Sequence, residues 1–257
     1  MNQVPSPAKT PPGRRIDVYP DLANLSRAAA AQFAELAASA VTLRGKFTVA
    51  LSGGNTPKEL YHLLASDFRT QLPWDRIHAF WGDERYVPFG DLSSNYGTAR
   101  VAFLDPVGMP DSNIHPMPTS FADPAEAAAV YETTLRSFFS DSPPAFDLIL
   151  LGMGSDGHIA SLFPSSPALA DTSRWVVGVE VDAVPPRRLS LTLPVINGAR
   201  AVIVLVAGEE KRDAVRNVLV RAKKARRGLP ATLLEGRGEV HWLLDREAAG
   251  EAFPART

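Results

Sequence analysis

The sequence predicts an α/β protein in which a mostly parallel sheet is flanked by helices on both faces. Two observations support this fold class. Short, nearly continuous apolar runs are typical of strands buried on both sides. Several of these runs lead through a glycine-bearing loop into a helix pattern, which is the repeating unit of a parallel sheet. The expected strands lie at residues 47–51, 77–81, 147–151, 175–181, 189–193, 201–206 and 240–244.

The expected helices are placed by their periodicity and by their end signals. Residues 21–41 repeat apolar side chains at steps of three and four, as an amphipathic helix requires. Thr56-Pro57-Lys58-Glu59 has the pattern of a capping box with proline at the first helical position. The same signature begins the stretch 123–139, and a further helix is expected over 208–223.

The composition belongs to a globular protein without a strongly charged face. The 257 residues are 45% hydrophobic and carry a net charge of −1, so no nucleic-acid footprint or membrane-surface patch is indicated. The absence of cysteine excludes disulfides, thiolate catalysis and cysteine-ligated zinc. No apolar run approaches membrane-spanning length, and the N-terminus lacks the apolar centre of a signal peptide. We therefore expect a cytoplasmic protein that binds neither nucleic acid nor membrane.

The domain organisation is expected to be simple. Residues 1–15, which are rich in proline, predict a disordered leader, and residues after Asp245 predict a loose tail. Residues 16–257 are expected to form a single domain, since no internal repeat is found. We expect a monomer or a weak homo-oligomer.

A candidate anion site follows the strand at 47–51. Ser52-Gly53-Gly54-Asn55 leads directly into the expected helix, and free N–H groups at a helix start attract phosphate through hydrogen bonds and the helix dipole. Ser52 and Thr56 add hydroxyl groups. The alternative is a tight turn with no ligand. The loop is not a Walker A loop, because that spacing is absent.

Charged and polar residues follow the next strand. Asp83-Glu84-Arg85 comes directly after the run at 77–81, and Tyr86-Val87-Pro88 would partly shield the three charges. A solvated surface cluster is the alternative interpretation. The polar stretch at 91–96 is suited to hydroxyl recognition, although neither feature is specific alone.

The clearest catalytic candidate lies in the stretch 147–164, which reads DLILLGMGSDGHIASLFP. An apolar strand ends in a glycine-rich loop that carries Asp156 and His158. The carboxyl end of a buried strand is where open α/β sheets place their chemistry. The sequence has no metal-ligand cluster, so His158 is expected to act as a general base on water or on a substrate hydroxyl, with a carboxylate fixing its tautomer. The other histidines lie in contexts that favour structural or solvated roles; they are His62, His78, His115 and His241.

Two alternative interpretations of this loop are weaker. A serine nucleophile would need glycine on both sides of Ser155, but Met153 occupies the first position. Residues 152–157 spell G-x-G-x-x-G, which raises a nicotinamide or flavin site. However, Asp156 would lie against the pyrophosphate, and Pro164 leaves room for only a short helix. We therefore expect no cofactor and no metal.

The parallel arrangement brings these candidates together. The carboxyl ends of parallel strands share one edge of a sheet, where ligands bind. The loops after residues 51, 81, 151 and 206 should therefore converge around one pocket. Its expected contributors are Ser52–Thr56, Asp83–Arg85, Asp156 with His158, and Lys211.

At this point the motifs identify a family resemblance that covers nearly the whole chain beyond the leader. In order and spacing, LSGGNTPKELY, WGDERYVPFGDLSSNYGTAR, LILLGMGSDGHIASLFP, RLSLTLPVINGAR and the turn at 208–211 resemble 6-phosphogluconolactonases. Glucosamine-6-phosphate deaminases of the wider, Rossmann-like superfamily share the SGG and DGH loops. They continue with an Asn-Glu-Pro segment, whereas this chain has Ala160–Pro164, the lactonase form. One residue departs from the lactonase pattern: Ile159 replaces the usual threonine, as in the deaminases.

The resemblance implies hydrolysis of 6-phospho-D-glucono-1,5-lactone to 6-phosphogluconate in the oxidative pentose phosphate pathway, with no metal or redox cofactor. It implies that His158 is the base, that Asp156 helps to build its loop, and that Asp83 and Arg85 line the sugar end. The residues it implies for the phosphate are Ser52, Gly53, Gly54, Thr56 and Lys211, with Arg188 as a further candidate.

Two other functions stay open from the sequence. A glucosamine-6-phosphate deaminase would release ammonia from its substrate, but the Asn-Glu-Pro segment is missing. A non-catalytic sugar-phosphate sensor would ordinarily carry a DNA-binding segment, and residues 1–15 are too short for a helix-turn-helix.

Overall fold

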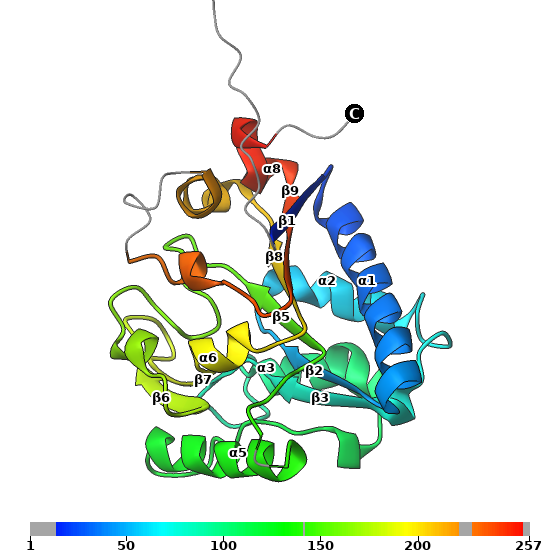
Figure 1. Cartoon of the computed structure of the whole chain (residues 1–257), viewed down its shortest axis with the longest axis vertical. Coiled ribbons are helices and arrows are strands. Elements are labelled where there is room, and N and C mark those ends of the chain that lie inside the picture. The colour runs from blue at the N-terminus through cyan, green and yellow to red at the C-terminus, as the bar shows by residue number, and fades with distance from the viewer. Residues whose placement is uncertain (1–13, 141, 221–227, 254–257) are drawn as a thin grey trace, which may run out of the picture.

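The computed structural model describes residues 14–140, 142–220 and 228–253. Its centre is a six-stranded parallel sheet in the order β1-β9-β8-β5-β2-β3 (Figure 1). These strands are β1 (Arg14–Tyr19), β2 (Phe47–Leu51), β3 (Ile77–Trp81), β5 (Leu148–Gly152), β8 (Ala201–Val206) and β9 (Glu239–Asp245). All five residues of β2 are buried, as expected for a strand with helices or strands on every side.

Helices pack on both faces of this sheet, which confirms the predicted fold class (Figure 1). The long helix α1 (Leu22–Arg44) and α2 (Asn55–Ala65) pack together on one face, and α5 (Pro124–Phe138) contacts the second sheet. Asp123 caps α5 through the Ala125 N–H, as the sequence predicts. The shorter helices are α3 (Asn95–Ala99), α4 (Asp105–Val107), α6 (Leu193–Asn197), α7 (Arg212–Val215) and α8 (Arg246–Ala249).

A second, antiparallel sheet is the main departure from the sequence-based expectation. It has the order β4-β7-β6, with β4 (Asp83–Arg85), β6 (Val176–Glu180) and β7 (Arg187–Leu191). The predicted strands at 175–181 and 189–193 belong here and not to the parallel sheet, and the charged stretch after β3 is itself a strand. Gly82 connects the two sheets, since its N–H donates to Leu51 O at 2.8 Å and its carbonyl accepts from the Leu191 N–H at 2.8 Å.

Both ends of the predicted domain need correction. Residues 14 and 15, assigned to the leader, belong to β1, which pairs in register with β9 from Arg14↔Val240 to Tyr19↔Asp245. The rest of the expected leader lies outside the described residues. The segment after Asp245 is not a loose tail in its described part, because it forms α8, where Ala248 and Ala249 are buried.

Candidate functional site

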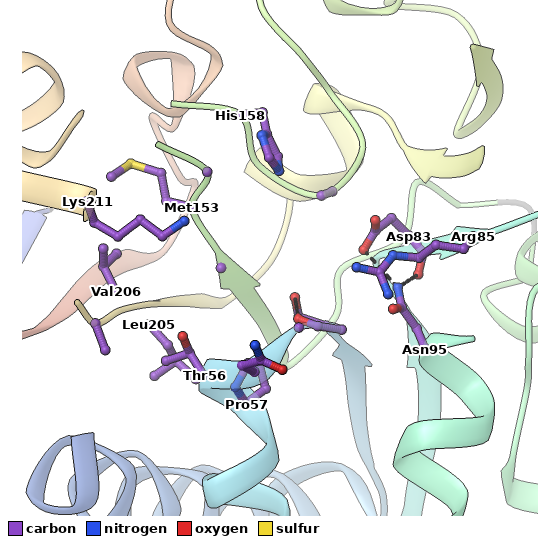
Figure 2. A pocket seen from close by; sticks show the side chains of 18 of the residues that line it. Thr56, Pro57, Asp83, Arg85, Asn95, Met153, His158, Leu205, Val206 and Lys211 are labelled. Carbon is purple, nitrogen blue, oxygen red and sulfur yellow. Dashed lines mark hydrogen bonds between the residues drawn. The ribbon is translucent and has the colours of Figure 1, made fainter. Parts of the chain in front are cut away.

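A pocket of about 240 Å³ lies where β2, β5 and β8 end and where β4 and β7 of the second sheet approach them (Figure 2). The loops that follow these strands therefore converge around one pocket, as the sequence predicts. The lining residues are Ser52, Gly53, Gly54, Asn55, Thr56, Pro57, Asp83, Arg85, Asn95, Gly152, Met153, Gly154, His158, Ala160, Arg188, Leu205, Val206, Ala207, Glu210 and Lys211.

The first wall of the pocket is the anion loop, which we define as Ser52–Thr56. Gly54 has a φ of 98° and precedes the first residue of α2 without any side-chain cap, so the N–H groups of this helix start are available to a ligand. The predicted capping box is wrong, because Thr56 lies inside the first turn and faces the pocket. The loop's position is fixed from below by Tyr61, whose hydroxyl donates to Ser52 O at 2.6 Å and accepts from Ser52 N–H at 3.2 Å. Burial raises the pKa of Tyr61, so this hydroxyl keeps its proton.

His158 lies above the anion loop at the end of β5 (Figure 2). Its Nδ1 is 2.6 Å from Asp156 Oδ1, and because a carboxylate can only accept, the proton belongs on Nδ1 and the lone pair on Nε2. The ring stacks on Phe163 with centroids 4.1 Å apart. A Cβ on Gly154 would overlap both the imidazole and the Asp156 carboxylate, so this position requires glycine. The adjacent Ile159 is buried, and its side chain packs in the core.

Another side of the pocket is formed by Asp83, Arg85, Asn95 and Arg188. We call these four residues the polar wall. Asp83 is only 6% exposed, and its carboxylate accepts a 2.7 Å hydrogen bond from Ser161 Oγ. Asn95 donates through Nδ2 to Asp83 O at 2.8 Å (Figure 2). Since Ser161 follows the His158 loop, this network fixes Asp83 relative to the candidate base.

Two guanidinium groups complete the polar wall. Arg85 and Arg188 are cross-strand partners in the β4–β7 pair. Arg85 Nη1 donates to Ser93 O at 2.8 Å, and Arg188 Nε donates to Pro185 O at 3.0 Å. Burial, and then the neighbouring Arg85, lower the pKa of Arg188. The pair gives this side of the pocket a positive charge suited to an anionic oxygen.

Glu84 anchors the polar wall from behind. It is fully buried, and its carboxylate accepts from the N–H groups of Arg85, Asn95 and Tyr96, all at 2.7 Å, and from Ser94 Oγ at 3.3 Å. Burial raises the pKa of Glu84 to about 7. The four hydrogen bonds act in the opposite direction, because donors to a carboxylate favour its ionised form. Strand alternation turns Asp83 and Arg85 toward the pocket and Glu84 toward the start of α3.

Lys211 supplies the cation at the remaining side. It ends a short 3-10 turn, Glu209–Lys211, that follows β8, and its side chain extends toward Met153 and the pocket (Figure 2). Glu210 lines the same side. The predicted long helix over 208–223 therefore starts as this 3-10 turn and continues as α7, and its residues from 221 onward lie outside the described part of the chain.

The structure brings together nearly all of the residues predicted for the site. Two of them do not line the pocket: Asp156 contacts His158 instead, and Glu84 turns toward the start of α3. Sequence reasoning left Asn95 and Glu210 unassigned, placed Glu84 in the pocket although it lies behind the polar wall, and missed Ser161. Asn95 stood in a polar stretch that the sequence had marked, but nothing local distinguished it. No local signal separates Ser161 from other serines, since its partner Asp83 is 78 residues away.

Within the described residues, no three or more His, Asp or Glu side chains form a group able to hold a metal ion. No described helix has the length and hydropathy needed to cross a membrane.

The chain is similar in sequence and in fold to several known proteins. Residues 20–242 match the family model described as glucosamine-6-phosphate isomerases/6-phosphogluconolactonase. A 6-phosphogluconolactonase of Synechocystis is 48% identical over 218 residues, covering 84% of this chain and 88% of that protein. One from Mycobacterium tuberculosis is 41% identical over 243 residues, covering 92% and 97%. The structure of 6-phosphogluconolactonase from Trypanosoma cruzi superposes with a TM-score of 0.83 at 30% identity, covering 92% of this chain and 96% of that one. The chain belongs to the glucosamine-6-phosphate isomerase/6-phosphogluconolactonase family.

Proposed function

We propose that this protein is a 6-phosphogluconolactonase, a hydrolase that opens 6-phospho-D-glucono-1,5-lactone to 6-phosphogluconate in the oxidative pentose phosphate pathway. The observation that supports it best is the 2.6 Å contact between His158 Nδ1 and Asp156, in a pocket that also contains an uncapped helix start. A base and an anion site in one pocket suit a phosphorylated substrate that must be attacked by water. The names of the lactonases at 41–48% identity point to the same substrate.

In the proposed mechanism His158 acts as the general base. Nε2 removes a proton from a water molecule as its oxygen adds to the lactone carbonyl, and Asp156 stabilises the resulting imidazolium. The tetrahedral intermediate collapses with cleavage of the ring C–O bond, and the imidazolium returns the proton to the departing alkoxide. Arg85 stabilises the negative charge that develops on the carbonyl oxygen. Asp83 orients the sugar hydroxyls.

The substrate phosphate is assigned to the anion loop. Backbone N–H groups of Gly53 and Gly54, with the Ser52 and Thr56 hydroxyls, provide donors, and Lys211 provides the countercharge. Arg188 is the further candidate for an anionic oxygen. The phosphate would hold the far end of the substrate while the lactone carbonyl lies near His158.

The test is a rapid assay on freshly prepared lactone that follows 6-phosphogluconate through its dehydrogenase, with spontaneous hydrolysis subtracted. We expect His158→Ala to lower kcat by about 10²–10⁴-fold, because general-base catalysis contributes that much, while inorganic phosphate binding stays unchanged. The matched control is His62→Ala, at an exposed position of α2, which should leave kcat unchanged.

Other results would decide against the proposal. If the native protein does not exceed the spontaneous rate, lactonase activity is wrong, and ammonia release from glucosamine 6-phosphate becomes the next assay. If His158→Ala weakens binding but keeps kcat at saturating substrate, the base assignment is wrong.

A further inference from the structure

Asp245 is a buried carboxylate that lies outside the pocket but contacts the turn that carries Lys211. It is the last residue of β9 and is 5% exposed. Its Oδ2 accepts from the Gly208 N–H at 3.0 Å, and its Oδ1 accepts from the same N–H at 3.2 Å and from the Ala248 N–H at 2.8 Å. One carboxylate therefore caps α8 and fixes the start of the turn after β8.

The turn leaves Lys211 little freedom once Gly208 is fixed. Gly208 has a φ of 100°, which favours glycine, and its carbonyl accepts from the Lys211 N–H at 3.1 Å. Only two residues separate the residue that Asp245 holds from the lysine. The hydrogen bond at Gly208 therefore sets the backbone position from which the Lys211 side chain reaches the pocket.

The residue after Lys211 is tied to the same C-terminal segment. Arg212 Nε donates to Glu247 O at 3.2 Å, and a Cβ on Gly250 would lie 2.9 Å from Arg212 Cδ. Lys211 is thus held between two residues, Gly208 and Arg212, that both contact residues 245–250. In Figure 1, α8 follows directly from the end of β9, next to β8 and β1.

We infer that Asp245 is a positioning residue for phosphate binding, which acts by holding Gly208 so that Lys211 points into the pocket. This inference rests on the proposed function, in which Lys211 binds the substrate phosphate. It assigns α8 a role in the site, although no residue of α8 lines the pocket.

The charge of Asp245 and its proposed positioning role predict opposite changes in phosphate affinity when Asp245 is replaced. Replacing Asp245 with a neutral residue removes a negative charge on the side of the pocket that binds an anion, and this should strengthen phosphate binding. If Asp245 positions Lys211, the same replacement should weaken it.

Two variants separate the contacts of Asp245. Asp245→Ser keeps one oxygen that can cap α8 through Ala248 N–H but lacks a counterpart of Oδ2, the oxygen that lies closer to the Gly208 N–H. Asp245→Asn keeps the size and offers only one accepting oxygen. The matched control is Asp123→Asn, a helix-capping aspartate at the start of α5 that contacts Ala125 N–H and does not line the pocket. Lys211→Ala is the reference for loss of the cation.

The measurement is the Kd of inorganic phosphate for the full chain by calorimetry, together with KM and kcat on the lactone. We expect both Asp245 variants to raise Kd and KM by about tenfold to 150-fold, as for the loss of one hydrogen bond to a charged group, with kcat within about twofold. Lys211→Ala should raise both at least as much, and Asp123→Asn should change neither.

Each other outcome is informative. Unchanged Kd in the Asp245 variants, with a raised Kd in Lys211→Ala, overturns the inference alone. A lower kcat with unchanged KM gives Asp245 a structural role only and also overturns it. Unchanged Kd in Lys211→Ala overturns the phosphate assignment of the proposed function. If Asp245→Asn does not fold, Asp245→Ser decides, because it keeps the helix cap.

Discussion

The anion loop and the polar wall face each other across one pocket, but they are built in different ways. The anion loop, residues 52–56, offers backbone N–H groups at the start of α2 and depends on its own sequence and on one nearby residue, Tyr61. The polar wall offers side chains whose positions depend on residues far away in the chain, such as Ser161 for Asp83. A binding site made of backbone can be recognised locally, whereas one made of side chains needs the assembled fold.

The two sides also touch each other, at Gly53 and Asn95. A Cβ on Gly53 would overlap the Asn95 side chain, which is 2% exposed and is held by Asp83 O at 2.8 Å. Asn95 Oδ1 has no hydrogen-bond partner among the described residues. The contact makes the anion loop and the polar wall a single unit at this point.

Among the variants that test how the two sides are connected, Gly53→Ala is expected to lower kcat/KM the most. The added methyl cannot be accommodated without moving the loop or Asn95, and overpacking of this kind costs about 1–3 kcal/mol. We expect kcat/KM to fall by about tenfold to 100-fold. Steady-state kinetics of Gly53→Ala, Asn95→Ala and the double variant would measure the coupling, and the double variant should lose less than the product of the single losses.

Gly90→Ala is the matched control for this experiment, because a Cβ there would meet nothing within 4 Å. It should leave kcat/KM unchanged. Strictly multiplicative losses in the Gly53 and Asn95 variants would mean that the two sides act independently, contrary to this interpretation.

A smaller effect is expected from a change in Glu84, which lies behind the polar wall. Each carboxylate oxygen of Glu84 accepts at least one backbone N–H. In Glu84→Gln one of these oxygens becomes an N–H₂ group, which would then face an N–H donor. We expect the free energy of unfolding to fall by about 1–3 kcal/mol and kcat/KM to fall with it. The Kd of inorganic phosphate should rise less than in Gly53→Ala, because Glu84 reaches the anion loop only through Asn95. Urea unfolding and calorimetry would measure these quantities. Glu126→Gln, exposed on α5, is the control, and a greater loss of phosphate affinity in Glu84→Gln than in Gly53→Ala would contradict this order of effects.

The smallest effect concerns the other end of β3 and should leave both sides of the pocket unaffected. His78 Nδ1 lies 3.3 Å from His115 Nε2. Burial, and then His78, lower the pKa of His115 to about 4, and burial, followed by Lys46, lowers the pKa of His78. A histidine in the unfolded chain has a pKa near 6.5. Below that pH the folded protein therefore binds fewer protons than the unfolded chain. Stability should therefore be complete above about pH 6.5 and fall as the pH drops toward about 4.

His115→Phe tests this origin of acid sensitivity. The substituted side chain can still stack on Phe80, whose ring centroid lies 4.3 Å from that of the His115 ring. Unlike histidine, it cannot be protonated. We expect the loss of unfolding free energy between pH 7.5 and 4.5 to shrink by about 1–2 kcal/mol in this variant, as measured by urea unfolding. His62→Gln should not change that loss. An equal loss in His115→Phe and the native protein would place the acid sensitivity elsewhere.

The sequence by itself determined the parallel sheet and the identity of most residues in the pocket. Buried strands of a parallel sheet are continuous apolar runs, and their glycine loops follow immediately, so the runs at 47–51 and 201–206 coincide with β2 and β8. Ser52, His158 and Lys211 could be placed together because parallel strands end at a common edge. These are relations within a few residues of the chain, which a sequence displays directly.

The tertiary structure alone decided which polar residues hold the others in place. Short strands read alike whether they pair in parallel or antiparallel fashion, so β4, β6 and β7 could not be assigned to a second sheet from their residues. β1 and α8 were missed because their stability comes from packing on β9 and not from local propensity. Glu84, Ser161 and Asp245 likewise have no local signature, since hydrogen bonds to distant partners give them their roles, and only the folded chain brings those partners within 3 Å or so.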